Sequence, residues 1–267
     1  MASPGVDLYN NAYGNYERDL YREVRLETYG EDFGQTSWVT NEESQEIPRL
    51  LQIGSGSPVL EIGCGSGGYA LYLAETYRCE IVGLDLNGEG IRNAATLAER
   101  KNLGGLCRFE QCDVSQSLPF AEETFDAVFS NDVLCHVPRR LELLGEIFRV
   151  LKPRGRLLFS DALVVGGMIS HEEIAMRSAI GRYFFSPPGE NEKLLERAGL
   201  HLICARETTE SAVAISARWR DAREKRKADF MEVEGEANFN GLQRFLDCVH
   251  KLCSARRLLR FLYVARK

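Results

Sequence analysis

Hydrophobic and polar positions alternate along most of the chain in a way that predicts strands separated by helices. The short apolar runs are typical of buried strands and lie at 57–62, 79–84, 106–111, 125–130, 155–161, 200–206 and 258–266. The stretches between them carry apolar residues at helical spacing, with helix starts near Ser66, Gly88, Arg139 and Glu190. Alternating strands and helices predict a mainly parallel sheet covered by helices.

Helical patterns also flank and interrupt this alternation. A tyrosine-rich helix is expected from Asn11 to Glu27, and a second helix from Thr40 to about Gly54. Thr40 and Glu43 have the spacing of a capping box.

The same spacing recurs in the second half of the chain, at Ser170 and Glu173, so much of an insertion at 162–189 is expected to be helical. A second insertion at 207–256 shows two helical patterns split at 234–236.

The most distinctive motif is the glycine-rich turn that follows the first of these strands. Gly63, Gly65 and Gly68 fit G-x-G-x-x-G, a weak signal when it stands alone. Glycines allow a sharp turn and close approach of a ligand, and free N–H groups at the following helix start favour acidic groups. The turn therefore predicts a nucleotide-type cofactor site at the mouth of the sheet.

Two carboxylates near this turn bear on which cofactor binds. Asp85 ends the second strand, where it can accept both ribose hydroxyls of NAD, FAD or S-adenosylmethionine. Glu61 lies inside the first strand, where a charge is costly without a partner. It would repel a pyrophosphate and orient a cationic amino acid end, which favours S-adenosylmethionine. A dinucleotide, or a glycine turn without a ligand, are the alternatives.

Further motifs follow in order along the chain. Asp113 lies at a third strand end, placed to accept from an adenine amino group, and Asn131 at the fourth is placed for the methionine end of the cofactor. Together, E-I-G-C-G-S-G-G at 61–68, Asp85, C-D-V at 112–114, S-N-D-V-L-C-H-V at 130–137 and L-K-P-R-G-R-L at 151–157 resemble the class I S-adenosylmethionine-dependent methyltransferases over roughly residues 55–205.

This resemblance implies an α/β, Rossmann-like fold with a seven-stranded, mainly parallel sheet whose last strand is antiparallel. It implies S-adenosyl-L-methionine as the cofactor. The residues that it places at the cofactor are Glu61, Gly63, Cys64, Gly65, Asp85, Leu86, Asp113, Val114 and Asn131.

The segment at 130–136 also resembles the phosphoethanolamine N-methyltransferases, which carry S-R-D-x-x-x-H. Ser130, Asp132 and His136 match, while Asn131 replaces the arginine. In that family an N-terminal tyrosine lies over the active site, for which the candidates here are Tyr9, Tyr13, Tyr16 and Tyr21. A cofactor-covering loop falls at 34–38, which implies contacts from Gln35, Ser37 and Trp38. No residues of this chain align with the phosphate-binding residues of that family.

Two residues are the candidates for catalysis. His136 is the leading general base, with a role in the pocket wall as the alternative. Asp132 either contacts a substrate cation or caps the next helix. In the first insertion, Arg177, Arg182 and Tyr183 either face an acidic substrate or, as we favour, face solvent.

These patterns divide the chain into a helical cap and an interrupted core. Residues 1–54 form the cap, and residues 55–206 the cofactor-binding core with a substrate lid at 162–189. A helical insertion at 207–256 interrupts the last hairpin, and 257–267 form the last strand. A cap and a lid over the crevice suit a small substrate better than a polymer.

Composition narrows the function classes. The net charge of −6, with acids mixed into the basic clusters, argues against a nucleic-acid partner. No apolar run is long enough to span a membrane, and the N-terminus lacks a secretory pattern, so we expect a cytoplasmic protein. Eight cysteines without C-x-x-C spacing predict reduced thiols and no metal site.

The sequence therefore predicts an S-adenosylmethionine-dependent methyltransferase of small molecules, with an amine nitrogen favoured as acceptor. O- or C-methylation of a hydroxylated, carboxylated or quinone-like metabolite is one alternative. A protein that binds S-adenosylmethionine without catalysis is another. No pattern in the chain predicts an oligomeric state.

Overall fold

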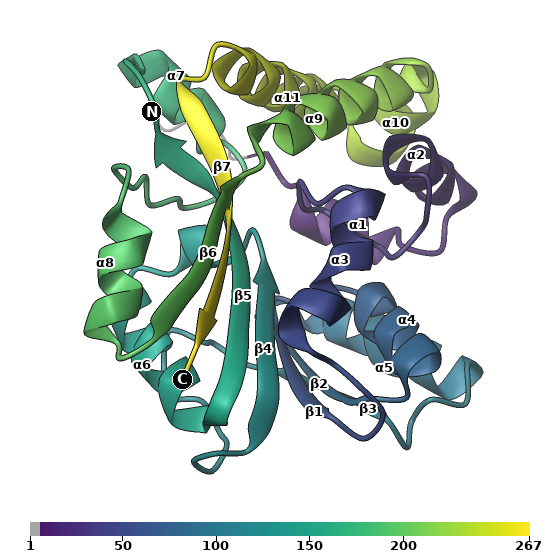
Figure 1. Cartoon of the computed structure of the whole chain (residues 1–267). Coiled ribbons are helices and arrows are strands. Elements are labelled where there is room, and N and C mark those ends of the chain that lie inside the picture. The colour runs from purple at the N-terminus through teal and green to yellow at the C-terminus, as the bar shows by residue number, and fades with distance from the viewer. Residues whose placement is uncertain (1–5) are drawn as a thin grey trace.

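A seven-stranded sheet runs through the centre of the computed structural model, which describes residues 6–267 (Figure 1). The strand order is β3-β2-β1-β4-β5-β7-β6. The bounds are β1 (Pro58–Ile62), β2 (Glu80–Asp85), β3 (Cys107–Gln111), β4 (Phe125–Asn131), β5 (Leu151–Val165), β6 (His201–Glu207) and β7 (Leu258–Arg266). Neighbours among β1 to β5 are parallel, whereas β7 is antiparallel to β5 and β6. This topology confirms the predicted Rossmann-like fold.

Helices precede, connect and interrupt these strands. Those before the sheet are α1 (Tyr9–Gly14), α2 (Asp19–Tyr29) and α3 (Asn41–Leu51). Those between strands are α4 (Gly68–Tyr77), α5 (Gly88–Arg100), a short 3-10 turn η1 (Leu134–His136), α6 (Arg140–Val150), α7 (His171–Arg177) and α8 (Glu190–Arg197). Between β6 and β7 lie α9 (Thr209–Glu224), α10 (Lys227–Glu234) and α11 (Glu236–Ser254).

Both faces of the sheet are covered, as a parallel sheet requires. Alternate residues of β5 point to opposite faces: Phe159 packs with Ile147 of α6 and Leu195 of α8, whereas Leu158 packs with Ile47 of α3 and Leu73 of α4. All six of these side chains are fully buried. The strands are thereby held firmly, with their carboxyl ends directed toward the helices above the sheet (Figure 1).

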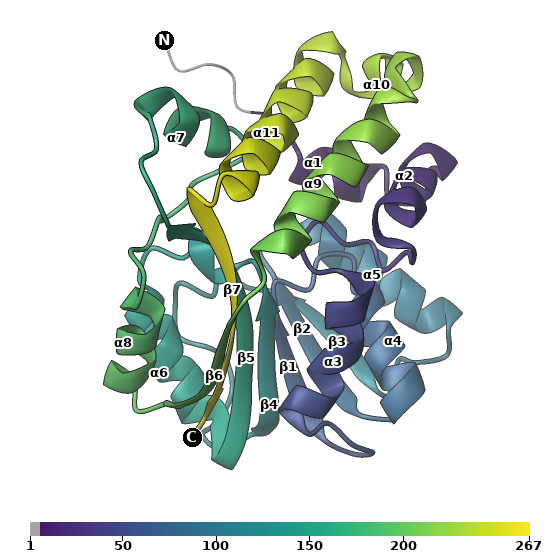
Figure 2. The ribbon, with the colours of Figure 1, turned by 45° about the horizontal axis from the view of Figure 1, so that its top comes forward.

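A helical layer lies over those carboxyl ends (Figure 2). It combines α2 from the start of the chain with α9, α10 and α11 from near its end. Tyr21 of α2, Trp219 of α9, Phe230 of α10 and Phe245 of α11 share one hydrophobic cluster with Leu163 of β5. The N-terminal cap and the late insertion therefore form a single roof on the sheet.

Several predicted boundaries are confirmed. The capping boxes at Thr40 and Ser170 both form, each with its glutamate three residues later. Strands β6 and β7 pair as an antiparallel hairpin although three helices interrupt it.

Other expectations about helices are wrong. The tyrosine-rich segment is two helices, because α1 ends at Gly14 and the Asn15 side chain donates to the Asn11 carbonyl at 2.9 Å. The first insertion is α-helical only at His171–Arg177, since its start extends β5, where Val164 and Val165 pair with β7.

The second insertion contains a break that the sequence did not reveal, between α9 and α10. Arg226 lies at this break and donates to the Ala222 carbonyl while pairing with Glu23 and Glu27 of α2. Contacts with a distant helix thus accompany the end of α9.

Residues 1–5 of the predicted cap lie outside the described residues. Within residues 6–267, no helix combines the length and the hydrophobicity needed to cross a membrane.

Candidate active site

A cavity of about 710 Å³ lies at the carboxyl ends of β1, β2 and β4. The glycine-rich turn lines one side, while Tyr9, Tyr13 and the loop 33–37 line the roof, and Ile180 and Arg182 come from the first insertion. The predicted cofactor-binding and catalytic residues, with the exception of Trp38, line this cavity: Gln35, Ser37, Glu61, Gly63, Cys64, Gly65, Asp85, Leu86, Asp113, Val114, Asn131, Asp132 and His136.

The glycine turn is held against the end of β2 in a conformation that only glycine adopts readily. Gly63 and Gly65 have φ values of 80° and 53°. The Gly63 and Cys64 amides both donate to the Leu84 carbonyl, at 2.7 and 3.0 Å. A Cβ atom on Gly65 would lie 2.9 Å from the Tyr13 hydroxyl oxygen. The backbone therefore lies directly against the cavity roof.

Glu61 is a buried carboxyl group at the inner end of this turn. Its side chain lines the cavity, and its Oε2 atom has no hydrogen-bond partner within residues 6–267. Burial, reinforced by the charge of Asp85, raises the pKa of Glu61 to about 8. A cationic ligand group would supply the missing partner.

Asp85 is oriented by backbone amides at the end of β2. Its carboxylate accepts from the amides of Gly65 and Asn87, both at 2.8 Å. Burial raises the pKa of Asp85, and these two hydrogen bonds oppose that rise. The carboxylate still lines the cavity, so its remaining lone pairs can accept from a ligand.

Asp113 and Asn131 extend the polar lining. Asp113 accepts from the Ser115 amide at 2.9 Å, and its hydrogen bonds with Ser115 lower its pKa. The Asn131 Oδ1 atom is buried without a hydrogen-bond partner in the described part of the chain. The cofactor end of the cavity is therefore rich in acceptors.

His136 lies on the opposite side of the cavity, in η1. Its Nδ1 atom is 2.9 Å from the Arg182 carbonyl oxygen, which can only accept, so Nδ1 carries the hydrogen. Nε2 is then the acceptor in the neutral ring and receives the Tyr9 hydroxyl at 3.1 Å. Burial lowers the pKa of His136, and burial raises that of Tyr9 well above its usual value. The pair therefore combines a neutral imidazole with a protonated phenol.

Tyr183 and Arg177 stand behind this pair. The Tyr183 ring lies 4.2 Å from the His136 ring, and the Arg177 guanidinium lies 4.4 Å from the Tyr183 ring centre. Arg177 is 1% exposed, so our expectation that it faces solvent is wrong. The exposed Arg182 lines the cavity.

Two predicted roles do not match the geometry. The Trp38 side chain packs against Trp219 and Phe245 and does not line the cavity, so the structure does not place it at the predicted cofactor contact. Asp132 neither caps α6, whose start has no side-chain cap, nor presents a free carboxylate, because it is paired with the buried Arg260 at 3.0 Å. Both residues owe these positions to distant partners.

The cavity also shows which N-terminal tyrosines reach it. Tyr9 and Tyr13 line it, whereas Tyr16 stacks under Arg25 and Tyr21 donates to Glu234. Gln35 lines the cavity, but its amide bonds back to its own loop, to the Phe33 amide and the Glu31 carbonyl.

Sequence reasoning passed over Thr36, Ile180 and Pro138, which also line the cavity. Thr36 lies in the covering loop predicted at 34–38 and Ile180 in the lid predicted at 162–189, but no local signal distinguishes these side chains from their neighbours.

Comparison with known families connects this geometry to a domain type. The family described as "Methyltransferase domain" matches residues 60–159, which include the glycine turn, Asp85, Asp113 and His136. The seven-stranded sheet with its antiparallel last strand is the one expected for class I enzymes. Residues 60–159 thus match a methyltransferase domain. Our predicted resemblance is thereby confirmed.

Individual methyltransferases are similar over different lengths. Phosphoethanolamine N-methyltransferase 1 of Triticum aestivum is 31% identical over 229 residues, covering 83% of this chain and 45% of that protein. Fatty-acid O-methyltransferase of Mycolicibacterium smegmatis is 45% identical over 108 residues, covering 40% of this chain and 38% of that protein. The chain thus spans less than half the length of these two curated relatives.

Solved methyltransferase structures share the fold over nearly the whole chain. Phosphoethanolamine N-methyltransferase 2 of Haemonchus contortus, in complex with phosphomonomethylethanolamine and S-adenosylhomocysteine, superposes with a TM-score of 0.81 at 20% identity. The alignment covers 97% of this chain and 60% of that one. The likeness therefore includes the helical layer above the sheet as well as the methyltransferase domain.

The cavity fits S-adenosylmethionine in its donors and acceptors. The unpartnered carboxyl of Glu61 suits a cationic amino acid end, and a pyrophosphate would meet the acidic side chains of Glu61 and Asp85 instead of a cation. Asp85 is available for ribose hydroxyls and Asp113 for an adenine amino group. The exposed Leu86 offers an apolar surface beside them.

Proposed function

We propose that this chain is an S-adenosylmethionine-dependent methyltransferase whose acceptor is a small molecule, with an amine nitrogen favoured. The observation that carries the proposal is the buried Glu61 carboxyl, which lines the glycine-turn cavity and has no partner atom within residues 6–267. The matched methyltransferase domain and the bound S-adenosylhomocysteine in the Haemonchus contortus structure support it.

When bound, S-adenosylmethionine supplies an electrophilic methyl group, while the protein provides binding, orientation and a dry site. Glu61 and Asn131 would hold the methionine end, Asp85 the ribose and Asp113 the adenine. Gly63, Cys64, Gly65, Leu86 and Val114 would shape the surface against it, with Gln35 in the roof. All these residues line one cavity, which supports their assignment to one ligand.

The acceptor side centres on Tyr9 and His136. An ammonium substrate must lose a proton before its nitrogen can act as a nucleophile. His136 is neutral, with Nε2 facing the Tyr9 hydroxyl, so it can take up a proton that passes through this hydroxyl. This arrangement supports His136 as the general base. An amine acceptor also agrees with the N-methyltransferase relative from Triticum aestivum.

The enclosure supports a small acceptor. Residues 6–54 and the insertion at 162–189 both contribute to the cavity walls, the latter through Ile180 and Arg182. We propose that these segments act as cap and substrate lid of the cofactor-binding core at 55–206, with 207–256 as a helical insertion before the last strand at 257–267. We also propose action in the cytoplasm, since all eight cysteines are free, as reducing conditions require.

The fatty-acid O-methyltransferase relative makes O-methylation the second candidate, with C-methylation and cofactor binding without catalysis as further alternatives. The test is transfer of a labelled methyl group to a panel of small amines, then to hydroxyl, carboxyl and quinone-like compounds. Labelled amine products support the proposal. If only the hydroxyl, carboxyl or quinone-like compounds give labelled products, the acceptor is not an amine. A protein that binds S-adenosylmethionine but methylates nothing in the panel supports a non-catalytic role.

A further inference from the structure

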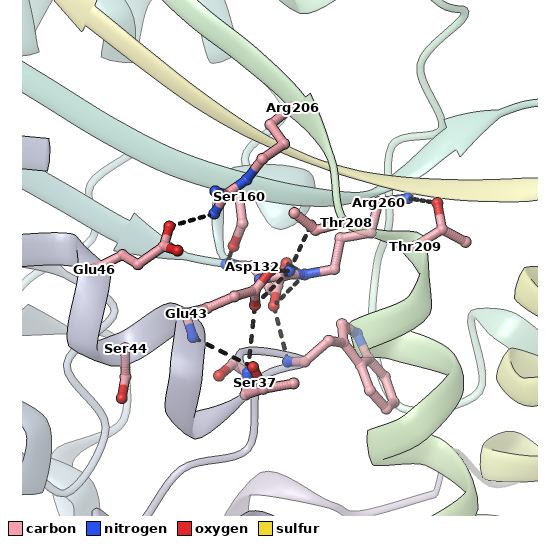
Figure 3. Close-up of polar contacts among 12 residues, drawn as sticks. Ser37, Glu43, Ser44, Glu46, Asp132, Ser160, Arg206, Thr208, Thr209 and Arg260 are labelled. Carbon is pink, nitrogen blue, oxygen red and sulfur yellow. Dashed lines mark hydrogen bonds and ion pairs between the residues drawn. The ribbon is translucent and has the colours of Figure 1, made fainter.

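Arg260 of β7 is a fully buried cation between two carboxylates from distant parts of the chain (Figure 3). Its Nε atom donates to Asp132 at 3.0 Å, and its Nη1 atom donates to Glu43 of α3 at 2.9 Å. Both carboxylates are themselves buried. One guanidinium therefore joins the end of β4 to α3.

The same arginine also fixes the start of the late helical insertion. Its Nη1 atom donates to the Thr208 hydroxyl at 2.7 Å, and its backbone amide donates to the Thr209 hydroxyl at 3.1 Å. The Thr208 amide donates in return to the Arg260 carbonyl at 2.7 Å. Arg260 thus ties both α3 and the start of α9 to the sheet.

Asp132 connects this cluster to the cavity. It has a φ of 58°, in the left-handed region that a residue other than glycine seldom adopts. Its amide donates to the Ser160 hydroxyl at 3.0 Å, and its Oδ2 atom accepts from the Trp38 amide at 2.8 Å (Figure 3). The carboxylate is therefore shared between Arg260 and the loop that covers the cavity.

The residues next to these contacts line the cavity. Asn131 and Val133 flank Asp132 at the end of β4, and Thr36 and Ser37 precede Trp38 in the covering loop. Val133 also packs against Gly63, leaving no room there for a side chain. The positions of both the floor and the roof of the cavity thus depend on the same carboxylate.

We propose that Arg260 is a positioning residue of the methyltransferase site, which acts through Asp132 and Glu43 to hold the covering loop over the cavity and Asn131 beside it. This inference rests on the proposed function for its catalytic consequence. It assigns Asp132 to the architecture of the site, so a substrate cation is not its partner.

The first test measures amide hydrogen exchange and needs no cofactor. In Arg260→Met, exchange in residues 36–40 should rise at least about tenfold while exchange in β1 and β2 stays unchanged, because the loss is local to the covering loop. Arg260→Lys keeps the positive charge but not the forked donors of the guanidinium. Its exchange rate in residues 36–40 should therefore lie between those of wild type and Arg260→Met.

The second test measures binding of S-adenosylhomocysteine by calorimetry. Arg260→Met should weaken binding by about 100-fold, the scale expected when site groups are misplaced by a distant change. Asp132→Asn should have a similar effect, and the double variant should be no worse than either single one, because the three groups act as a unit. The matched control is Arg206→Met, which breaks a half-exposed pair between β6 and Glu46 of α3 and should leave both readouts unchanged (Figure 3).

Wild-type exchange at 36–40 in a folded Arg260→Met protein would overturn the proposal, whatever the cofactor. So would an Asp132→Asn variant that loses affinity for an amine acceptor alone and keeps its affinity for S-adenosylhomocysteine. If Arg260→Met does not fold, exchange in residues 36–40 and affinity for S-adenosylhomocysteine are measured in Arg260→Lys and Glu43→Gln instead, and wild-type exchange in both would overturn the proposal. Failure of the proposed function has a different signature, since the wild-type protein would then bind no S-adenosylhomocysteine.

Discussion

Glu61 is buried at a cost in free energy that binding of the proposed cofactor would offset. A buried carboxyl without a partner in the described residues is unfavourable, and its pKa of about 8 expresses that cost. A cationic ligand group reverses the balance, because a nearby opposite charge favours the carboxylate. The protonation state of Glu61 should therefore change when the cofactor binds.

Proton release on cofactor binding is the first prediction. Near neutral pH the free Glu61 is mostly protonated, and binding of S-adenosylmethionine should drive off this proton. The affinity should therefore rise with pH toward about 8 and level off above it. Calorimetry in buffers of different ionisation enthalpy measures the release directly.

Glu61→Gln should remove this proton release. It should also weaken binding about 10- to 100-fold, since a hydrogen bond to a charged group contributes about 1.5–3 kcal/mol. Glu80→Gln, on the exposed start of β2, is the matched control and should behave as wild type. Unchanged affinity in Glu61→Gln would mean that Glu61 does not meet the cofactor.

The second prediction concerns His136. Burial lowers its pKa, so the base is already neutral at neutral pH, and kcat/KM should fall only as the pH drops through a value below 6.5. His136→Gln should lower kcat by about 10²- to 10⁴-fold with little change in cofactor affinity. His250→Gln is the control, because its Nδ1 atom also faces a backbone carbonyl, but it lies on α11. Equal turnover in both variants would leave His136 as a wall residue.

At the scale of elements, the glycine turn shows how a local conformation and a tertiary contact act together. Gly65 and Gly56 both have positive φ, yet only Gly65 has close neighbours at the position of a Cβ atom. Gly56→Ala should therefore cost only the backbone term, about 1–2 kcal/mol in the free energy of unfolding. Gly65→Ala should cost more and should also abolish cofactor binding, as chemical denaturation and calorimetry would show. Normal binding by Gly65→Ala would contradict the placement of the turn.

Elements were predictable where their signals are local. The strands, the glycine turn and the two capping boxes rest on residues within a few positions of one another, such as Thr40 with Glu43. The break between α9 and α10 was missed, because the partners of Arg226 include Glu23 and Glu27, far away in the sequence. The length of β5 was missed for a similar reason, since Val164 and Val165 pair with β7, far along the chain.

At the scale of the whole molecule, the roof joins the two ends of the chain. Arg223 of α9 pairs with Glu234 of α10 at 2.7 Å, and Tyr21 of α2 donates to the same carboxylate at 2.6 Å. Both charged side chains are almost fully buried. Arg223→Met should therefore lower the free energy of unfolding by about 3–5 kcal/mol, because it leaves the buried Glu234 carboxylate without its counter-charge.

The control for Arg223 is Arg220→Met on the same helix. Arg220 is partly exposed and pairs with Asp221 and Asp247, so its loss should cost at most about 1 kcal/mol. Denaturant unfolding of both variants checks the difference. Equal costs would mean that the buried pair does not hold the roof together.

The assembled fold also determines which distant residues contact the site, and the sequence did not predict these contacts. Motifs placed Glu61, Asp85 and His136 correctly at one edge of the sheet. They did not reveal that Tyr9 is the tyrosine hydrogen-bonded to His136, or that Arg260 forms an ion pair with Asp132. The partners in each pair are more than a hundred residues apart. Such pairings follow from the assembled fold.

The decisive measurement for the proposed cofactor is calorimetry of the purified chain against S-adenosylmethionine, S-adenosylhomocysteine and NAD, with mass spectrometry of any co-purified ligand. We expect binding of the first two in the micromolar range, about −8 kcal/mol, and none of NAD. Asp85→Ala should abolish that binding. Binding of NAD alone, or unchanged binding by Asp85→Ala, would contradict the proposed cofactor site.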